Sequence, residues 1–239
     1  MQKDNRPYLI RLLVENFYKF WSRHFLIPQF KRVGKNLDVN KPWNIDVYGN
    51  NISIGENVHI RTSKNLITQL CSWNKNNCDG VIKIGDNVLI SPGVRIISAK
   101  EIIIKSNVMI ASNVYISDSD WHGIYDRVNT PGLSQNITIE ENSWIGEGSK
   151  ISKGVKIGKN SIIGLGSVVT SNVPDNEIFG GNPAKKIGEI DKNKKIRKRE
   201  DLFLNNDYNK LMKFLIKEDL KENNFFAWLR VLFFPKKGD

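Results

Sequence analysis

The sequence predicts a mainly β fold, a parallel β-helix with three flat faces, flanked by amphipathic helices at both ends of the chain. The leading observation is an aliphatic side chain at every sixth position in one long stretch, namely Ile139, Ile145, Ile151, Ile157, Ile163 and Val169. Four positions after each of these residues there is a small or β-branched one, namely Ser143, Ser149, Val155, Ser161, Ser167 and Val173. An α-helix repeats every about 3.6 residues and a strand every two, whereas a six-residue period is typical of a β-helix with one inward residue per face.

The same period extends towards the N-terminus. Two further sets of aliphatic residues keep the six-residue step, Ile104, Ile110 and Ile116 and, before them, Ile84, Ile90 and Ile96. Ile54 and Ile60 form an isolated first fragment, so the repeat is expected over residues 52–173. Three glycines directly follow aliphatic residues and are expected to take the backbone angles of tight turns, namely Gly146, Gly158 and Gly164.

Interruptions of the repeat indicate where the chain leaves the β-helix. The step from Ile96 to Ile104 is eight residues, a slip that a bulge would absorb. Residues 61–80 are polar and too irregular to be part of the wall. The interval from Ile116 to Ile139 is 23 residues, five more than one coil of 18, so a loop is expected to leave the β-helix there.

The N-terminal segment, residues 6–27, is predicted to be an amphipathic helix. Its apolar stripe recurs at every fourth position, at Leu9, Leu13, Phe17, Trp21 and Phe25. Charged residues recur on another face, so the segment lacks the roughly 20 apolar residues that a membrane span requires. This helix is expected to pack on another part of the protein or to lie on a surface.

The C-terminal part also has helical spacing, over residues 201–221, and ends in the apolar run FFAWLRVLFF within residues 224–235. That run is short for a span and contains Arg230. Two interpretations stay open: it covers an end or side of the β-helix, or it makes a peripheral membrane contact. In the second, Trp228 and the phenylalanines insert, and Arg230, Lys236 and Lys237 lie at the head groups.

The formal net charge of +11 is concentrated in residues 185–199. Such a run is either a solvated linker or an anion site for phosphates or a phospholipid surface. Nucleic acid is not an expected partner, because no recognition module accompanies the charge. Cys71 and Cys78 do not have the spacing of a zinc site, and with no signal peptide they are expected to be reduced thiols without an assigned role. The expected division is a helix and lead-in over residues 1–51, the β-helix over 52–187 and a basic linker with a helical tail over 188–239.

Three phrases add a family resemblance to the repeat: NSWIG at residues 142–146, IGLGSVVTSNVPDN at 163–176 and GGNPAK at 180–185. With them, residues 52–187 resemble the hexapeptide-repeat acyltransferases, in particular maltose and galactoside O-acetyltransferases and the O-acetyltransferases of bacterial surface polysaccharides. The resemblance implies a left-handed β-helix, a homotrimer, and acetyl-CoA bound as acyl donor in a groove between neighbouring chains.

His122 is the expected catalytic residue among three histidines. It lies in the loop DSDWHGIYDR, residues 118–127, and matches the family's catalytic histidine, whereas His24 and His59 are expected to be structural. A sugar hydroxyl is a poor nucleophile, and imidazole is suited to take its proton near neutral pH. The predicted mechanism is direct attack in a ternary complex, with His122 as general base and then proton donor to the CoA thiolate. No metal is expected, since a γ-class carbonic anhydrase would need three converging histidines.

Further loop residues are expected to contact the acceptor. Three roles stay open for Asp118 and Asp120: to orient His122, to bind acceptor hydroxyls or to cap a turn. Trp121 and Tyr125 would stack on a sugar or pin the loop to a neighbouring chain. Arg127 completes the predicted substrate-binding set, which is Asp118, Asp120, Trp121, Tyr125 and Arg127.

The resemblance also implies a CoA-binding set. Trp144 would flank the pantetheine channel, and backbone groups one coil apart would contact the pantetheine arm, at Gly146, Glu147, Gly164 and Leu165. Thr170 and Ser171 stand where relatives often have Thr-Lys, and Glu147 replaces a frequent serine. Lys185 would contact the 3′-phosphate, and Lys186 would compensate for Ser171.

The expected function is therefore an O-acetyltransferase that moves acetyl from acetyl-CoA to a hydroxyl of a sugar or lipid-linked glycan in cell-surface polysaccharide synthesis. The expected location is the cytoplasm, including the inner face of the membrane. A xenobiotic (antibiotic) acetyltransferase is the enzymatic alternative. A non-catalytic trimeric scaffold is the alternative of a different class.

Overall fold

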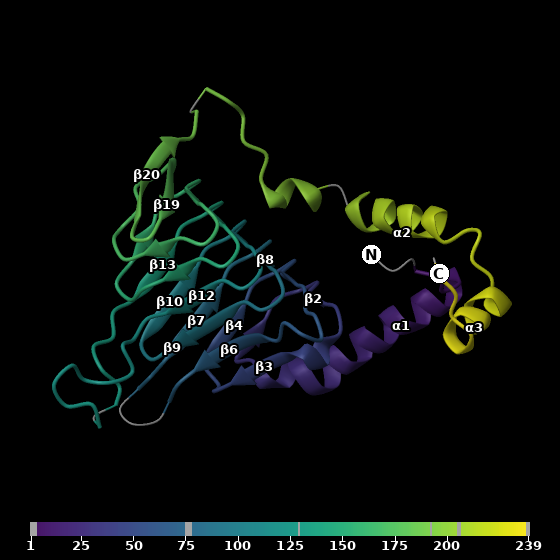
Figure 1. Cartoon of the computed structure of the whole chain (residues 1–239), viewed down its shortest axis with the longest axis horizontal. Helices are drawn as coiled ribbons and strands as arrows, with labels where there is room; N and C mark the ends of the chain where they lie inside the picture. Colours follow the sequence, from purple (N-terminus) through teal and green to yellow (C-terminus); the bar gives the residue numbers. More distant parts are fainter. Residues whose placement is uncertain (1–3, 75–77, 129, 192, 205–206, 238–239) are drawn as a thin grey trace.

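The body of the protein is a three-sided parallel β-helix (Figure 1). The computed structural model describes residues 4–74, 78–128, 130–191, 193–204 and 207–237. As far as β18, every third strand along the chain is a hydrogen-bonded neighbour, so successive strands lie on successive sheets. The mainly β prediction is confirmed in this form.

Each sheet is a stack of short strands. The first sheet contains β1 (Arg32–Val33), β4 (Ile52–Ile54), β7 (Val81–Ile84), β10 (Glu101–Ile104), β13 (Ile137–Ile139) and β16 (Lys156–Ile157). The second contains β2 (Asp38–Val39), β5 (His59–Ile60), β8 (Leu89–Ile90), β11 (Met109–Ile110), β14 (Trp144–Ile145), β17 (Ile162–Ile163), β19 (Glu177–Gly181) and β20 (Ala184–Glu189). The third contains β3 (Ile45–Tyr48), β6 (Thr68–Ser72), β9 (Arg95–Ser98), β12 (Tyr115–Ser117), β15 (Lys150–Ile151) and β18 (Val168–Val169). All neighbours are parallel except β19 and β20, which form an antiparallel hairpin at the end of the stack.

The core is a column of aliphatic side chains that the strand register stacks on one another. In the second sheet Ile90 pairs with Ile110, Ile110 with Ile145 and Ile145 with Ile163, and all four side chains are buried. Burying one such side chain stabilises the fold by about 1.5–3 kcal/mol relative to leaving it exposed. The six-residue period therefore identified the inward residues correctly.

The β-helix begins about one coil earlier than the sequence predicted. Strands β1, β2 and β3 pair in parallel with β4, β5 and β6, so the wall starts at Arg32 and not at residue 52. Part of the polar run 61–80 is also wall, because β6 buries Leu70 completely. Both segments were missed because their polar outward residues hide the inward aliphatic ones.

Asparagines, not the predicted glycines, take the left-handed backbone angles at the corner between the first and second sheets. Asn142 and Asn160 have φ of 61° and 58°, and the Asn142 amide donates to Asn160 over 2.9 Å. Gly146 does not have a positive φ; it is required because a Cβ there would lie 2.5 Å from the carbonyl oxygen of Ile163 in the next coil. Short side chains that hydrogen-bond locally tolerate the left-handed region, which explains the choice of asparagine.

The predicted slip between Ile96 and Ile104 lies at the corner between the third and first sheets, where Asp118 stabilises it. The buried Asp118 carboxylate accepts hydrogen bonds from the backbone amides of Ala99 (2.7 Å) and Lys100 (3.0 Å) and from the Ser98 hydroxyl (2.7 Å). Buried amides without partners are costly, so this carboxylate makes the extra residues tolerable.

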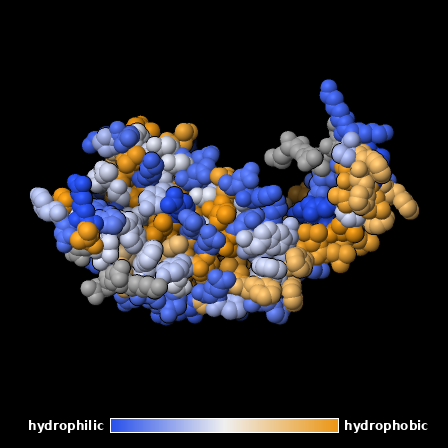
Figure 2. Space-filling view, turned by 60° about the horizontal axis from the view of Figure 1, so that its bottom comes forward, coloured by the Kyte–Doolittle hydropathy of each residue, from blue (hydrophilic) through white to orange (hydrophobic). Residues whose placement is uncertain are grey.

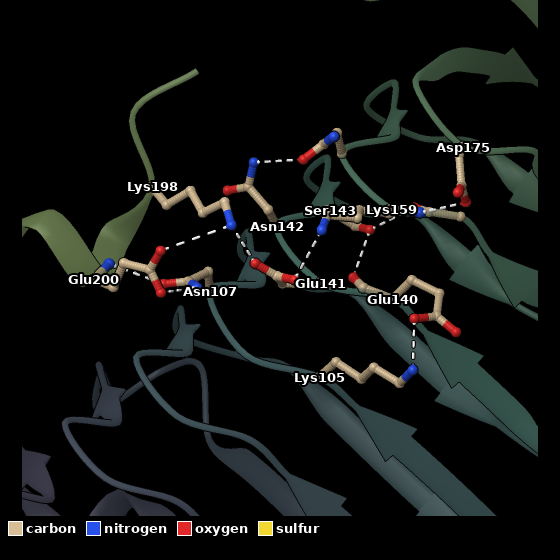
Figure 3. Close-up of polar contacts among 12 residues, drawn as sticks. Lys105, Asn107, Glu140, Glu141, Asn142, Ser143, Lys159, Asp175, Lys198 and Glu200 are labelled. Atoms are coloured by element: carbon tan, nitrogen blue, oxygen red, sulfur yellow. Dashed lines mark hydrogen bonds and ion pairs between the residues drawn. The ribbon is translucent and has the colours of Figure 1, made fainter. Parts of the chain in front are cut away.

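The basic segment before the tail is partly docked on the β-helix, rather than being wholly a solvated linker. A 3₁₀ turn, Arg199–Leu202, lies against the corner asparagines, where Glu200 accepts from the Asn107 amide over 2.9 Å (Figure 3). Lys198 forms an ion pair with Glu141, which holds the pKa of that carboxyl below its usual range. Arg199 donates to the backbone carbonyl of Asn87 over 2.8 Å.

The helices at the chain ends extend from the opposite end of the β-helix from the β19–β20 hairpin (Figure 1). Helix α1 spans Tyr8–Trp21 and continues through a π turn, Ser22–Leu26, and a 3₁₀ turn, Ile27–Gln29, so the predicted N-terminal helix is confirmed. Helices α2 (Asp207–Asp219) and α3 (Phe225–Phe233) form the tail. Helix α3 has no buried residue, so it does not cover the β-helix as one interpretation expected. Within the described residues, no helix is long and apolar enough to cross a membrane.

We expect the docked turn to make stability depend on pH through His59, which lies beneath Phe203 and whose Nδ1 is 3.4 Å from Arg199. Burial, assisted by the charge of Arg61, lowers the pKa of His59 from 6.5 to about 4. Between these values the unfolded chain binds a proton that the folded chain does not, so the free energy of unfolding falls as pH falls from about 6.5 to 4. Urea denaturation across this window should show a shallower fall for His59→Asn, and equal slopes would contradict the assignment.

A second prediction concerns Asp118. Replacing it with Ala leaves the amides of Ala99 and Lys100 without their acceptor at the slip, whereas the Ser98 hydroxyl can still donate to the Val81 carbonyl, so the free energy of unfolding should fall by about 2–4 kcal/mol. Asp126→Ala is the matched control, because the exposed Asp126 carboxylate accepts a local bond from Val128 over 3.3 Å. Urea denaturation measures both variants. An equal loss for the two would show that Asp118 is not needed for the slip.

Candidate active site

His122 lies in a loop that leaves the β-helix after β12 and returns in β13. Strands β12 and β13 follow each other directly around the coil. All residues between them in excess of one six-residue step therefore belong to the loop. The sequence expectation of one complete coil plus five residues was wrong on this point, although it located the loop correctly.

Polar contacts fix the base of this loop. Its two sides meet where the Gln135 amide donates to the Asp118 carbonyl (2.9 Å) and the Asp120 amide donates to the Leu133 carbonyl (3.1 Å). The Asp120 carboxylate forms an ion pair of 2.6 Å with Lys153 in the next coil. The Asp118 carboxylate accepts hydrogen bonds from the wall, and the Asp120 carboxylate is paired with Lys153. Both aspartates therefore hold the loop in place, which is closest to the turn-capping alternative, and contact of either with an acceptor stays a prediction.

The residue before His122 is held in an unusual backbone conformation. Trp121 has a φ of 68°, which costs about 1–3 kcal/mol for a bulky residue unless surrounding contacts impose it. Its indole N–H donates to the Ser117 hydroxyl over 3.0 Å, and its ring lies 5.8 Å from that of Trp73. Across the loop from His122, position 132 must be glycine, because any Cβ there would collide with the His122 carbonyl. Trp121 and Gly132 thus determine where the imidazole lies.

His122 lines a pocket of about 420 Å³ that is formed by two loops at the same corner of the β-helix. The walls are mostly apolar, and the lining residues are Trp73, Cys78, Ile97, Trp121, His122, Thr130 and Pro131. Trp73 and Cys78 come from the first loop, between β6 and β7, which the sequence analysis gave no role. Burial raises the pKa of the Cys78 thiol, so the thiol stays protonated at neutral pH.

The tip of the His122 loop points away from this pocket. Tyr125 is 100% exposed, and Ile124 and Val128 beside it are also exposed. Tyr125 and Arg127 do not line the pocket, so of the predicted substrate-binding residues only Trp121 lies there with His122. An apolar loop tip in solvent is typical of a surface that another chain covers.

Most of the predicted CoA-binding residues form a strip along the corner between the second and third sheets. Exposed Trp144 and Glu147 lie in one coil and exposed Leu165 in the next. The amide of Gly146 donates to Ile163 and that of Gly164 to Phe179, so these two amides serve the wall and are not free for a ligand.

The remaining predicted CoA residues lie apart from this strip. Thr170 and Ser171 are exposed at the corner between the third and first sheets, the corner that also carries the His122 loop. Lys185 is exposed on the terminal hairpin. Lys186 forms ion pairs with Glu177 (2.8 Å) and Glu189, and these two carboxylates raise its pKa. The role predicted for Lys186, to compensate for Ser171, stays a prediction.

The strip of Trp144, Glu147 and Leu165 and the His122 pocket lie at opposite edges of the third sheet. A strand of that sheet runs from the corner that carries the strip to the corner that carries the pocket. The two groups of residues therefore do not meet within one chain.

Comparison with known proteins agrees with the repeat. Residues 136–171 match the family model described as bacterial transferase hexapeptide (six repeats). No protein of curated function matches the sequence.

Solved structures show the same fold. One is a mutant of AntD, an N-acyltransferase from Bacillus cereus, in complex with dTDP-4-amino-4,6-dideoxyglucose and coenzyme A; it has a TM-score of 0.60 and 22% identity, over 80% of this chain and 97% of that chain. Another is AntD with dTDP and 3-hydroxybutyryl-CoA, with a TM-score of 0.54 and 20% identity, over 80% and 96% of the two chains. The chain thus carries a bacterial transferase hexapeptide repeat on a β-helical fold that it shares with a CoA-binding acyltransferase.

Proposed function

We propose that this protein is a CoA-dependent O-acetyltransferase that acts on a hydroxyl of a sugar or lipid-linked glycan in cell-surface polysaccharide synthesis. The observation that carries the proposal is the His122 imidazole at an apolar pocket walled by Trp73 and Trp121 on a hexapeptide β-helix. A lone imidazole suits acyl transfer, because this reaction needs a proton acceptor at the attacking oxygen.

The proposed reaction is a direct transfer in a ternary complex. The acceptor hydroxyl attacks the thioester carbonyl while the His122 imidazole takes its proton. The tetrahedral intermediate then collapses, the carbon–sulfur bond breaks, and the imidazolium returns the proton to the CoA thiolate. His122 ends the cycle neutral, so no second base is required.

We propose that two chains build each site in a homotrimer of left-handed β-helices. The support is geometric, since the His122 pocket and the strip of Trp144, Glu147 and Leu165 occupy opposite edges of one sheet. An adjacent chain would bring its strip to the pocket, and the exposed loop tip at Tyr125 would rest on that neighbour. The acetyl-CoA would bind along the strip, with Lys185 near its phosphates.

The two tryptophan rings suit a sugar acceptor, because aromatic faces pack on the apolar C–H face of a pyranose ring. An amino sugar is a second candidate acceptor, favoured by the complex of AntD with dTDP-4-amino-4,6-dideoxyglucose and coenzyme A. Attack by nitrogen would need the same proton acceptor. A reaction in the cytoplasm, where acetyl-CoA is available, fits either acceptor.

The proposal is tested by incubating the protein with acetyl-CoA and a panel of sugars, amino sugars, nucleotide sugars and lipid-linked glycans, and reading mass shifts. With the best acceptor, His122→Ala should lower kcat by about 10²–10⁴-fold without changing the oligomeric state. His24→Ala is the control, because His24 is exposed in the N-terminal helix. Near wild-type turnover of His122→Ala would refute the mechanism, and no acetyl-CoA binding by calorimetry would favour the scaffold alternative.

The two-chain site makes a separate prediction. Two variant proteins are prepared separately, one with His122→Ala in every chain and one with Trp144→Ala and Leu165→Glu in every chain. Each variant by itself should lose activity. Co-expression of the two should restore activity, because some sites then combine an intact loop with an intact strip from the other chain. Lack of restoration in mixed oligomers, verified by mass spectrometry, would show that each site belongs to one chain.

A further inference from the structure

Helix α3 is apolar except at Arg230, yet the protein covers only one side of it in part, at residues 228–231. Its sequence is FFAWLRVLF, and none of its residues is buried. Phe226 is 81% exposed and Phe233 is 67% exposed. A helix with this much exposed apolar surface is normally covered by protein or by lipid. Something outside the described chain is therefore needed to cover α3.

Helix α1 adds a second exposed apolar surface at the same end of the molecule. Leu9 is 72% exposed and Leu13 is exposed beside it. The two regions are joined by Asn223, which precedes α3 and donates to the backbone carbonyls of Asp4 (2.6 Å) and Arg6 (3.0 Å) just before α1. We name this surface the apolar cap and define it by Leu9, Leu13, Phe226, Leu232, Phe233 and Phe234.

The apolar cap lies away from the β-helix. Hydrophobic residues gather at the end of the molecule that carries α1 and α3 (Figure 2). The β-helix and the His122 loop lie towards the other end in Figure 1. The cap is therefore available to a partner without obstructing the candidate active site.

The charge around the cap indicates the nature of the partner. Residues 225–237 include Arg230, Lys236 and Lys237 and no acidic residue. At the N-terminal end of α1, which lies at the cap, Arg6 is paired with Asp4 and Arg11 with Glu15, so this part adds no net charge. Apolar side chains beside basic ones match an anionic bilayer, which offers a hydrocarbon interior under negative head groups.

We propose that the apolar cap binds the surface of an anionic lipid bilayer. Helix α3 has nine residues, about 14 Å of helix, against a hydrocarbon core of about 30 Å, so it lies in the interface and does not cross. Phe226, Phe233 and Phe234 insert below the head groups, and Arg230, Lys236 and Lys237 remain among them. The inference stands apart from the proposed chemistry, because it uses no residue of the His122 pocket.

A second copy of the chain is the competing occupant of the cap. Two caps in contact would bring residues 225–237 of both copies together, and this segment contains three basic residues and no acidic one. Like charges in an apolar contact oppose association, whereas anionic head groups neutralise them. The charge pattern therefore favours lipid over self-association.

The test is flotation of the full-length protein with two kinds of vesicle, phosphatidylcholine alone and phosphatidylcholine with about a third phosphatidylglycerol. Wild type should float with the anionic vesicles and much less with the neutral ones. Phe226→Glu should weaken binding to anionic vesicles by about 10- to 100-fold, because it replaces an inserted ring with a charge.

Leu204→Glu is the matched control, because Leu204 is 72% exposed outside the cap and carries the same change of charge. It should float like wild type. Equal flotation of Phe226→Glu and wild type, or no flotation of wild type, would overturn the proposal. A lower oligomer mass for Phe226→Glu without vesicles would assign the cap to a second copy. Acetyl transfer to a water-soluble acceptor, measured on the same samples, separates failure of the cap from failure of the proposed function.

Discussion

The stacking of aliphatic side chains in constant register is the constraint on which the rest of the structure depends. Each coil must place its inward residues over those of the coil before, as Ile110 lies between Ile90 and Ile145. A strand that gained one residue would turn its apolar side chains outwards. Additional residues are therefore tolerated only at corners, and both loops of the candidate site leave the β-helix at one corner. The site is a consequence of where the stack permits insertions.

Buried polar groups make these corners possible. Asp118 satisfies the amides at the slip, and corner asparagines such as Asn142 and Asn160 bond to one another from coil to coil. At Asn107 the partner comes instead from Glu200 of the basic segment, so the C-terminal part is anchored through the same corner. Residues that look like catalytic carboxylates in the sequence thus serve the wall. The loop that carries His122 is thus held at its base by these contacts.

The two ends of the molecule present different surfaces. The β-helix carries the His122 pocket and the exposed loop tip at Tyr125 at one corner and the strip that includes Trp144 at another, and in the proposed trimer a neighbouring chain would complete them. The other end of the molecule carries the apolar cap on α1 and α3, beside basic residues. In the proposed function, this separation would let the protein rest on a lipid surface while the His122 pocket stays accessible to a lipid-linked acceptor.

The six-residue period by itself determined the fold class, most of the core and the loop with His122, because one inward aliphatic residue per face is a local requirement that every coil repeats. It did not reveal β1–β3 or β6, whose outward polar residues mask the pattern. Only the tertiary structure decided that Asp118 is buried in the wall, that Trp73 and Cys78 join His122, and that Lys186 is paired with Glu177 and Glu189. These contacts join residues from different coils, and their partners depend on how the coils stack, which no local sequence pattern encodes.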